Sequence, residues 1–154
     1  KVNRVIVDDD IAVPDLAQSR GLAGTLFVHK IAGHLAEKGH DLAAVTRAAE
    51  RVIAGTRSIG MSLDTCTVPG SAKEDRIARG KAELGLGIHG EPGVQQIDFT
   101  NAEQAMAAMI EKLTAEADDV TYVALLNNLG AASVLEMSGW VPRSPKLTFQ
   151  PRRG

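Results

Sequence analysis

Apolar residues recur every three or four positions in three parts of the chain, a spacing typical of one helix face. Residues 21–38 form the first predicted helix, which Gly39 is placed to end. The second follows Asp41, a good N-terminal cap, and Gly55 is placed to end it. The third opens with a Thr-x-x-Glu capping box at Thr100. The apolar faces consist of Ala23, Phe27, Ile31 and Leu35, then Leu42, Val45, Ala49, Val52 and Ile53, and then Ala102, Ala105, Met106, Met109, Ile110 and Leu113.

Four other stretches have the pattern of β-strands. Val5–Val7 and Ser58–Cys66 are two of them, and Val120–Leu126 is a continuous apolar run, as expected of a buried parallel strand. Residues 82–89 give the clearest signal, because apolar residues alternate with other residues along them. One predicted face carries Ala82, Leu84, Leu86 and Ile88, and the other carries Glu83, Gly85, Gly87 and His89.

Alternating helices and strands indicate an α/β fold, in which helices pack on a layered sheet. A short further helix is expected near Ala131–Ser138. From Gly139 onward the chain holds three prolines and four basic residues without periodicity, so residues 1–138 are predicted as one domain and residues 139–154 as a basic tail. Since little precedes the strand-like Val5–Val7, we expect a piece cut from a longer protein, and so a partial version of its domain.

Composition narrows the function classes. The 154 residues carry a net charge of −2 and only 3% aromatic residues, which argues against nucleic-acid binding. With 44% apolar residues the chain can build a core, mainly from Ala, Val, Ile and Leu. No apolar run approaches the ~20 residues that span a bilayer. Cys66 is the only cysteine, so an internal disulfide is excluded and a reducing, cytoplasmic location is expected.

Residues 85–90 match the pattern G-x-G-x-x-G, but a dinucleotide site is rejected. That fingerprint needs a helix directly after the glycines, whereas Pro92 and further loop residues follow here. We interpret Gly85 and Gly87 instead as strand positions that clear space over one face of the sheet, so that another molecule can approach the backbone.

His89 is the residue of most chemical interest, because ligands of open α/β sheets usually bind beyond the carboxyl ends of strands. Its neutral ring can act as a base, a metal ligand or a nucleophile, while an ordinary loop histidine is an equally open interpretation. A mononuclear metal site built from His89, Glu91 and Asp64 also stays open, although no second histidine lies at ligand spacing.

Three other groups have ordinary structural interpretations. The Asn127–Gly130 segment follows a predicted strand and could bind an oxyanion, but a simple turn is favoured. The three acids Asp8–Asp10 are interpreted as a solvated acidic loop rather than a Mg²⁺ site. His29 and His34 are five residues apart on the first helix, about 140° around its axis, and so cannot easily share a metal.

Several segments, taken in order, resemble the substrate-binding (K) component of dihydroxyacetone kinases, in its C-terminal part. The resemblance covers about Val2–Ser138 and is strongest in the glycine-rich motif around His89. The matching stretches are Arg20–Thr25, Val28–Gly33, Cys66–Gly70, Gly85–Gly93 and Asn127–Gly130.

The resemblance implies a kinase for dihydroxyacetone or a related short ketose, in the context of glycerol metabolism. His89 would be the catalytic residue and bond covalently to the ketone carbon as a hemiaminal, and Gly85, Gly87 and Gly90 would leave room for the substrate. It implies no cofactor or metal in this chain. ATP or ADP with Mg²⁺ would be bound by a separate domain or subunit, and the protein would form a homodimer. No nucleic acid or membrane partner is expected.

The resemblance also limits the expected activity. Family members carry a catalytic aspartate and a second histidine in an earlier half, and no residues of this chain correspond to them. We therefore expect this segment to be inactive as a kinase by itself. Two alternatives remain: a non-catalytic ketose-binding or regulatory module, and an unfinished fragment without independent function.

Overall fold

A computed structural model describes residues 1–12, 20–65, 69–73, 75–87, 91–115, 121–130 and 132–140. The chain divides into two compact units. The first joins Lys1–Ser62 to Glu83–Gln95, and the second joins Leu63–Ala82 to Gln96–Gly154. The described residues contain both helices and strands, as the predicted fold class requires. None of the helices in the described ranges is both long and apolar enough to cross a membrane.

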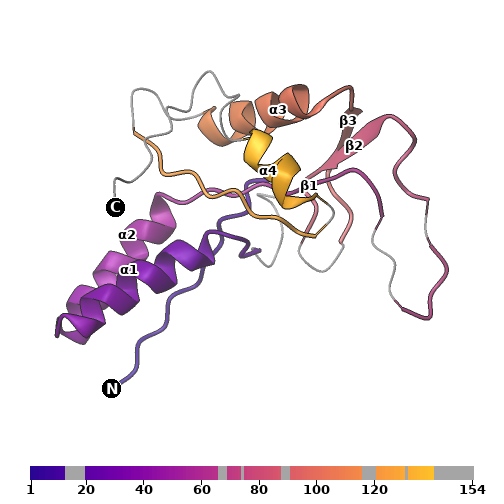
Figure 1. The fold of residues 1–154 in the computed structure, drawn as a ribbon. Helices are drawn as coiled ribbons and strands as arrows, with labels where there is room; N and C mark the ends of the chain where they lie inside the picture. Colours follow the sequence, from indigo (N-terminus) through magenta and orange to yellow (C-terminus); the bar gives the residue numbers. More distant parts are fainter. Residues whose placement is uncertain are drawn as a thin grey trace. The chain divides into compact units, whose positions relative to one another are not determined.

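A helical hairpin dominates the first unit. Helices α1 (Thr25–Glu37) and α2 (Leu42–Ala54) pack side by side (Figure 1). Both predicted C-terminal ends are confirmed, because Gly39 adopts a φ of 79° after α1 and Gly55 caps α2. The predicted start of the first helix at residue 21 is wrong, because α1 begins at Thr25. The Asp41 side chain accepts a hydrogen bond from the backbone N–H of Ala44 at 2.7 Å, which confirms the predicted cap. The helices approach closely because their buried residues are small or medium-sized: Val28, Ala48 and Ala49.

The strand predicted at Val5–Val7 is wrong. These residues have no regular secondary structure, and Ile6 is 60% exposed. The chain instead makes a single parallel bridge further along, between Asp10 and Ser58. The Ser58 N–H donates to the Asp9 carbonyl at 2.6 Å, and the Ile11 N–H donates to the Ser58 carbonyl at 3.0 Å. This bridge ties the start of the chain to the segment that leads into the sheet.

The sheet is shorter than its pattern predicts. Within the described ranges its strands are β1 (Met61–Ser62), β2 (Lys81–Leu84) and β3 (Gln95–Asp98), in the order β1-β2-β3. β1 pairs antiparallel with β2, with Met61 opposite Leu84. In the described part of the strand predicted over residues 58–66, which is residues 58–65, only Met61–Ser62 form a strand. The sequence pattern does not anticipate β3.

The strand predicted over residues 82–89 ends at Leu84. Gly85 has a φ of 80°, a left-handed conformation that turns the chain out of the strand. Within the strand itself Ala82, Glu83 and Leu84 are all buried, so both of its faces are covered. Gly85 and Gly87 therefore follow β2 rather than lying within it.

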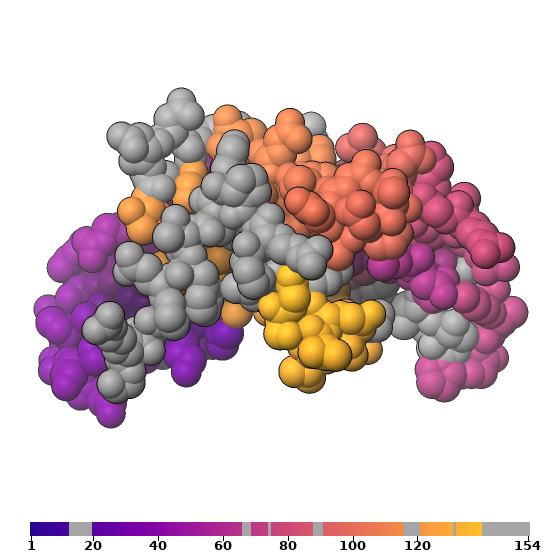
Figure 2. Space-filling view, turned by 45° about the horizontal axis from the view of Figure 1, so that its top comes forward, coloured from indigo at the N-terminus to yellow at the C-terminus, as the bar shows by residue number. Residues whose placement is uncertain are grey.

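The second unit contains helices α3 (Ala102–Thr114) and α4 (Val134–Trp140), which contact each other. The N-cap of α3 is Asn101 rather than the predicted Thr100, and its side chain accepts from the N–H of Gln104 at 2.9 Å. Ala105 and Ile110 are the buried residues of its predicted apolar face. Figure 2 shows α4, in yellow, at the surface of the molecule.

The buried strand predicted over Val120–Leu126 is contradicted for its described part. Residues 121–129 have no regular secondary structure, and Val123 is 80% exposed. An apolar run becomes a buried strand only when neighbouring strands pair with it, and no strand within the described ranges does so. Val120 lies outside the described residues, and so do residues 141–154 of the predicted tail.

Candidate functional site around the glycine-rich motif

The glycine-rich motif begins where β2 ends, in the first unit. Gly85, Leu86 and Gly87 are described, whereas Ile88, His89 and Gly90 lie outside the described residues, and so does Cys66. The two residues that flank this gap, Gly87 and Glu91, are joined by a backbone hydrogen bond of 3.3 Å from the Gly87 N–H to the Glu91 carbonyl. The predicted roles of His89 and Gly90 therefore stay predictions. The structure shows instead which residues hold the Gly85–Gly87 segment that precedes them.

Arg20 links the start of the chain to the motif. Its Nη2 donates to the Gly85 carbonyl at 2.9 Å. Its Nε donates to Asp10 Oδ2 at 2.7 Å, and Nη2 lies 2.5 Å from the same oxygen. The Asp10 side chain has no exposed surface, and that of Arg20 is 16% exposed. Charge-assisted hydrogen bonds in such a water-poor place are stronger than exposed ones.

Asp9 holds the backbone beside this ion pair. Its buried carboxylate accepts hydrogen bonds from the N–H of Leu22 at 2.7 Å and of Gly24 at 2.8 Å, and from the Ser58 hydroxyl. A side chain at Gly24 would place its Cβ 2.5 Å from the same carboxylate, so only glycine fits there. Asp9 thus fixes the segment that carries Arg20 against the segment that leads into β1.

The interpretation of Asp8–Asp10 as a solvated acidic loop is therefore wrong for two of its three residues. Asp8 is exposed, but Asp9 is only 2% and Asp10 7% exposed. A carboxylate can be buried when hydrogen-bond donors or a cation lie against it, and both Asp9 and Asp10 have such partners. Sequence reasoning assigned no role to Asp9, Asp10 or Arg20. The available signal was that acids directly follow an apolar stretch, and that Arg20 opens one of the motifs that carry the resemblance.

The two described glycines of the motif are packed against the protein itself. A Cβ at Gly85 would lie 2.6 Å from the Cβ of Ala12. At Gly87 it would overlap the Glu91 carboxylate and lie 2.9 Å from Arg20 Nη1. Protein atoms thus occupy the space that these glycines leave, which is a reason for glycine independent of any substrate. Substrate contact by Gly85 and Gly87 remains a prediction.

The Asn127–Gly130 segment forms a turn, as its favoured interpretation states. Asn128 Oδ1 accepts from the Gly130 N–H at 2.8 Å, and Asn128 Nδ2 donates to the Ala132 carbonyl at 2.6 Å. Gly130 has a φ of 105°, a conformation that L side chains rarely adopt. The amide of Asn128 is therefore engaged in shaping the turn.

Asp64, considered as a metal ligand with His89, belongs to the second unit. Its exposed carboxylate accepts a hydrogen bond from Lys73 Nζ at 2.7 Å. This bond lowers the pKa of Asp64 and raises the pKa of Lys73. Across the described ranges, no three His, Cys, Asp or Glu side chains gather to hold a metal ion. Because His89 lies outside those ranges, the three-residue metal site remains untested.

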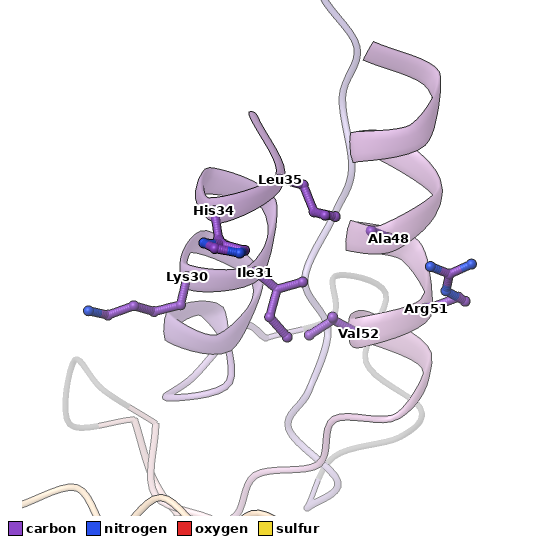
Figure 3. Close-up of a pocket in the computed structure, with 7 residues that line it drawn as sticks. All are labelled: Lys30, Ile31, His34, Leu35, Ala48, Arg51 and Val52. Carbon is purple, nitrogen blue, oxygen red and sulfur yellow. The ribbon is translucent and has the colours of Figure 1, made fainter. Parts of the chain in front are cut away.

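A groove of about 410 Å³ runs between α1 and α2 (Figure 3). Its polar side chains do not converge, since Lys30 and Arg51 point away from each other. His34 lines this groove, whereas His29 lines another depression of about 330 Å³ on the same hairpin. The two exposed histidines therefore face different surfaces, as their spacing predicts, and the groove lacks the convergent polar groups of a catalytic site.

The described residues combine helices with a small sheet, which is a mixed α/β fold, and the buried Asp10–Arg20 pair supports the glycine-rich motif that follows β2. The Dak1 domain family matches residues 1–147. The chain is 45% identical over 141 residues to a dihydroxyacetone kinase from Citrobacter freundii, covering 89% of this chain and 25% of that protein. A crystal structure of dihydroxyacetone kinase from C. freundii with AMP-PNP and Mg²⁺ matches with a TM-score of 0.80 over 88% of this chain and 26% of that one.

Two more distant relatives bear on function. The dihydroxyacetone-binding subunit DhaK of a PTS-dependent kinase from Listeria innocua is 36% identical over 143 residues, covering 88% of this chain and 44% of that subunit. The structure of a dihydroxyacetone kinase operon co-activator, Dha-DhaQ, matches at 29% identity with a TM-score of 0.66, over 73% of this chain and 35% of that one.

The chain belongs to the Dak1 domain family, as the resemblance predicted. It spans about a quarter of the length of the first relatives that it matches.

Proposed function

We propose that this chain is part of the substrate-binding component of a kinase for dihydroxyacetone or a related short ketose. The observation that carries the proposal is the family match over residues 1–147, together with relatives named as dihydroxyacetone kinases and as a dihydroxyacetone-binding subunit. The buried support of the Gly85–Gly87 segment agrees with a loop that must hold a reactive residue in one position.

In the proposed reaction, one neutral ring nitrogen of His89 attacks the carbonyl carbon of the ketose. A carbon–nitrogen bond forms as the carbonyl π bond breaks, the oxygen takes up a proton, and the other ring nitrogen releases one. Nothing leaves the substrate, so the hemiaminal forms by addition and can reverse. Glycerol has no carbonyl and cannot form this bond, so covalent capture would select the ketose over a polyol of similar size.

The captured ketose would present a terminal hydroxyl for phosphoryl transfer, a reaction in which positioning supplies much of the rate. We propose, from the family resemblance, that the nucleotide and its Mg²⁺ are bound by a separate domain or subunit. A homodimeric state, a cytoplasmic location and a role in glycerol metabolism are further parts of the proposal, and these rest on the family resemblance alone.

Native mass spectrometry of the 154-residue chain with dihydroxyacetone tests covalent capture. We expect an added mass of one dihydroxyacetone, which disappears on dilution and is absent in the His89→Ala variant. Glycerol is the matched control ligand and should add no mass. An unchanged mass at saturating dihydroxyacetone, in a chain that melts cooperatively, would contradict the proposal.

A non-catalytic binding or regulatory module is the second candidate, and the similarity to an operon co-activator favours it. The two candidates differ in phosphoryl transfer but not in capture. Joining the chain to the remaining parts of a Dak1 kinase and measuring ketose phosphorylation separates them. Phosphorylation that depends on His89 supports the kinase component, whereas an adduct without phosphorylation supports the regulatory module.

A further inference from the structure

We propose that Arg20 is a positioning residue that holds the start of the His89 loop in the conformation needed for ketose capture. This inference rests on the proposed function. It concerns a residue outside the motif itself, separated from Gly85 by 65 positions in the sequence.

The first support is that the backbone of Gly85 is held at both its N–H and its carbonyl. Its N–H donates to the Gly60 carbonyl at 2.8 Å, and its carbonyl accepts from Arg20 Nη2 at 2.9 Å. Gly85 is also the residue whose φ of 80° turns the chain out of β2. The direction in which the motif leaves the strand is thus set by two hydrogen bonds, of which Arg20 supplies one.

The second support is that Arg20 is itself held in place. Asp10 Oδ2 receives its Nε at 2.7 Å, while Asp10 Oδ1 accepts from the Ala12 N–H at 2.9 Å. The Asp10 N–H in turn donates to the Arg20 carbonyl at 3.2 Å. Because its acceptor is fixed through both carboxylate oxygens, the guanidinium has little freedom to leave the Gly85 carbonyl.

The third support is the placement of the guanidinium beside the next glycine. Arg20 Nη1 lies 2.9 Å from where a Gly87 Cβ would stand. Gly87 then donates its N–H to the Glu91 carbonyl, across the three residues that include His89. One planar group therefore contacts the carboxylate on one side and the first part of the motif on the other, which the single ammonium of lysine cannot reproduce.

The Arg20→Lys variant tests this role, with Arg47→Lys on the exposed surface of α2 as the matched control. Lysine retains the positive charge beside Asp10, so the thermal midpoint should stay close to that of the native chain. We expect the rate of adduct formation to fall about tenfold, as befits the loss of one hydrogen bond from a charged donor. Hydrogen exchange at the Gly87 amide should quicken, while exchange in α1 and α2 stays unchanged.

The double variant Arg20→Met with Asp10→Asn removes both charges and so avoids an unpaired buried carboxylate. It should fold, and it should show the same faster exchange at Gly87. Unchanged exchange and adduct rate in Arg20→Lys would overturn the proposal, and so would acceleration spread evenly over the first unit. If the native chain forms no adduct, the proposed function fails, while exchange at Gly87 still decides whether Arg20 holds the loop.

Discussion

Two neighbouring buried carboxylates are satisfied in different ways. Asp9 accepts from two backbone N–H groups and a hydroxyl, all of them neutral donors. Asp10 faces a guanidinium and one backbone N–H. The first arrangement fixes backbone, and the second fixes a side chain that reaches the glycine-rich motif. Together they turn an acidic stretch into a support for that motif.

Asp9→Ala should lower the free energy of unfolding by about 3 kcal/mol, because it leaves several buried donors without an acceptor. Urea denaturation of the native chain and of Asp9→Ala measures this change in the free energy of unfolding. Asp8→Ala is the matched control, since Asp8 is exposed and its loss should change stability by less than about 0.5 kcal/mol. Equal effects of the two substitutions would show that Asp9 does not hold the backbone as described.

Two glycines allow the stability cost of backbone strain to be measured separately from the cost of crowding. Gly80 and Gly85 have similar φ angles of 78° and 80°. No heavy atom lies within 4 Å of a Cβ at Gly80, whereas one at Gly85 would meet Ala12 and Val94. Gly85→Ala should therefore cost about 2 kcal/mol more than Gly80→Ala, the difference being overpacking. Similar unfolding midpoints for the two variants would mean that Gly85 serves only the turn.

At the scale of elements, helices were predicted well because their signals are local. Apolar spacing and the capping residues Asp41, Gly39 and Gly55 lie within the segments that they define. Strands were predicted poorly because they depend on partners that are distant in the sequence. The alternation over residues 82–89 continues past Leu84, but the strand ends there because Gly85 is left-handed. The spacing of apolar residues carries no information about the φ angle of a glycine.

The candidate site was predicted only in part for a related reason. Its motif could be read from the residues, whereas its support could not. Arg20 and Ser58 are distant in the sequence from both Asp9–Asp10 and Gly85, and only the folded chain brings these segments together. No periodic pattern links positions 10, 20, 58 and 85.

The first turn of α4 should respond to acid. Glu136 accepts hydrogen bonds from the N–H and the hydroxyl of Ser133, both at 2.7 Å, and Ser133 Oγ accepts from the Glu136 N–H at 3.2 Å. These bonds lower the pKa of Glu136 from its ordinary value of 4.5. The resulting stabilisation is complete above that value and is lost as the pH falls through the lowered one.

An NMR titration of the Glu136 carboxyl carbon measures this effect. The midpoint should lie below 4.5 in the native chain and move up toward 4.5 in Ser133→Ala, which removes the hydroxyl donor. A midpoint that is the same in both proteins would contradict the capping arrangement.

At the scale of the whole molecule, the chain combines a helical hairpin with apolar segments that remain exposed. Val123 and Leu125 are 80% and 40% exposed, in a stretch whose composition is typical of a buried strand. The chain spans about a quarter of the length of the first relatives that it matches. Fold class and family could be predicted from the sequence, whereas the extent of the sheet could not.

The proposed function depends above all on covalent capture of a ketose carbon by His89. The most direct measurement is a carbon NMR spectrum of dihydroxyacetone labelled with ¹³C at its ketone carbon, bound to the chain labelled with ¹⁵N in its histidines. Covalent capture should give a tetrahedral carbon signal that is split by one-bond coupling to nitrogen and is absent in His89→Ala. Signals of the free ketone and its hydrate alone, without coupling to nitrogen, would contradict it.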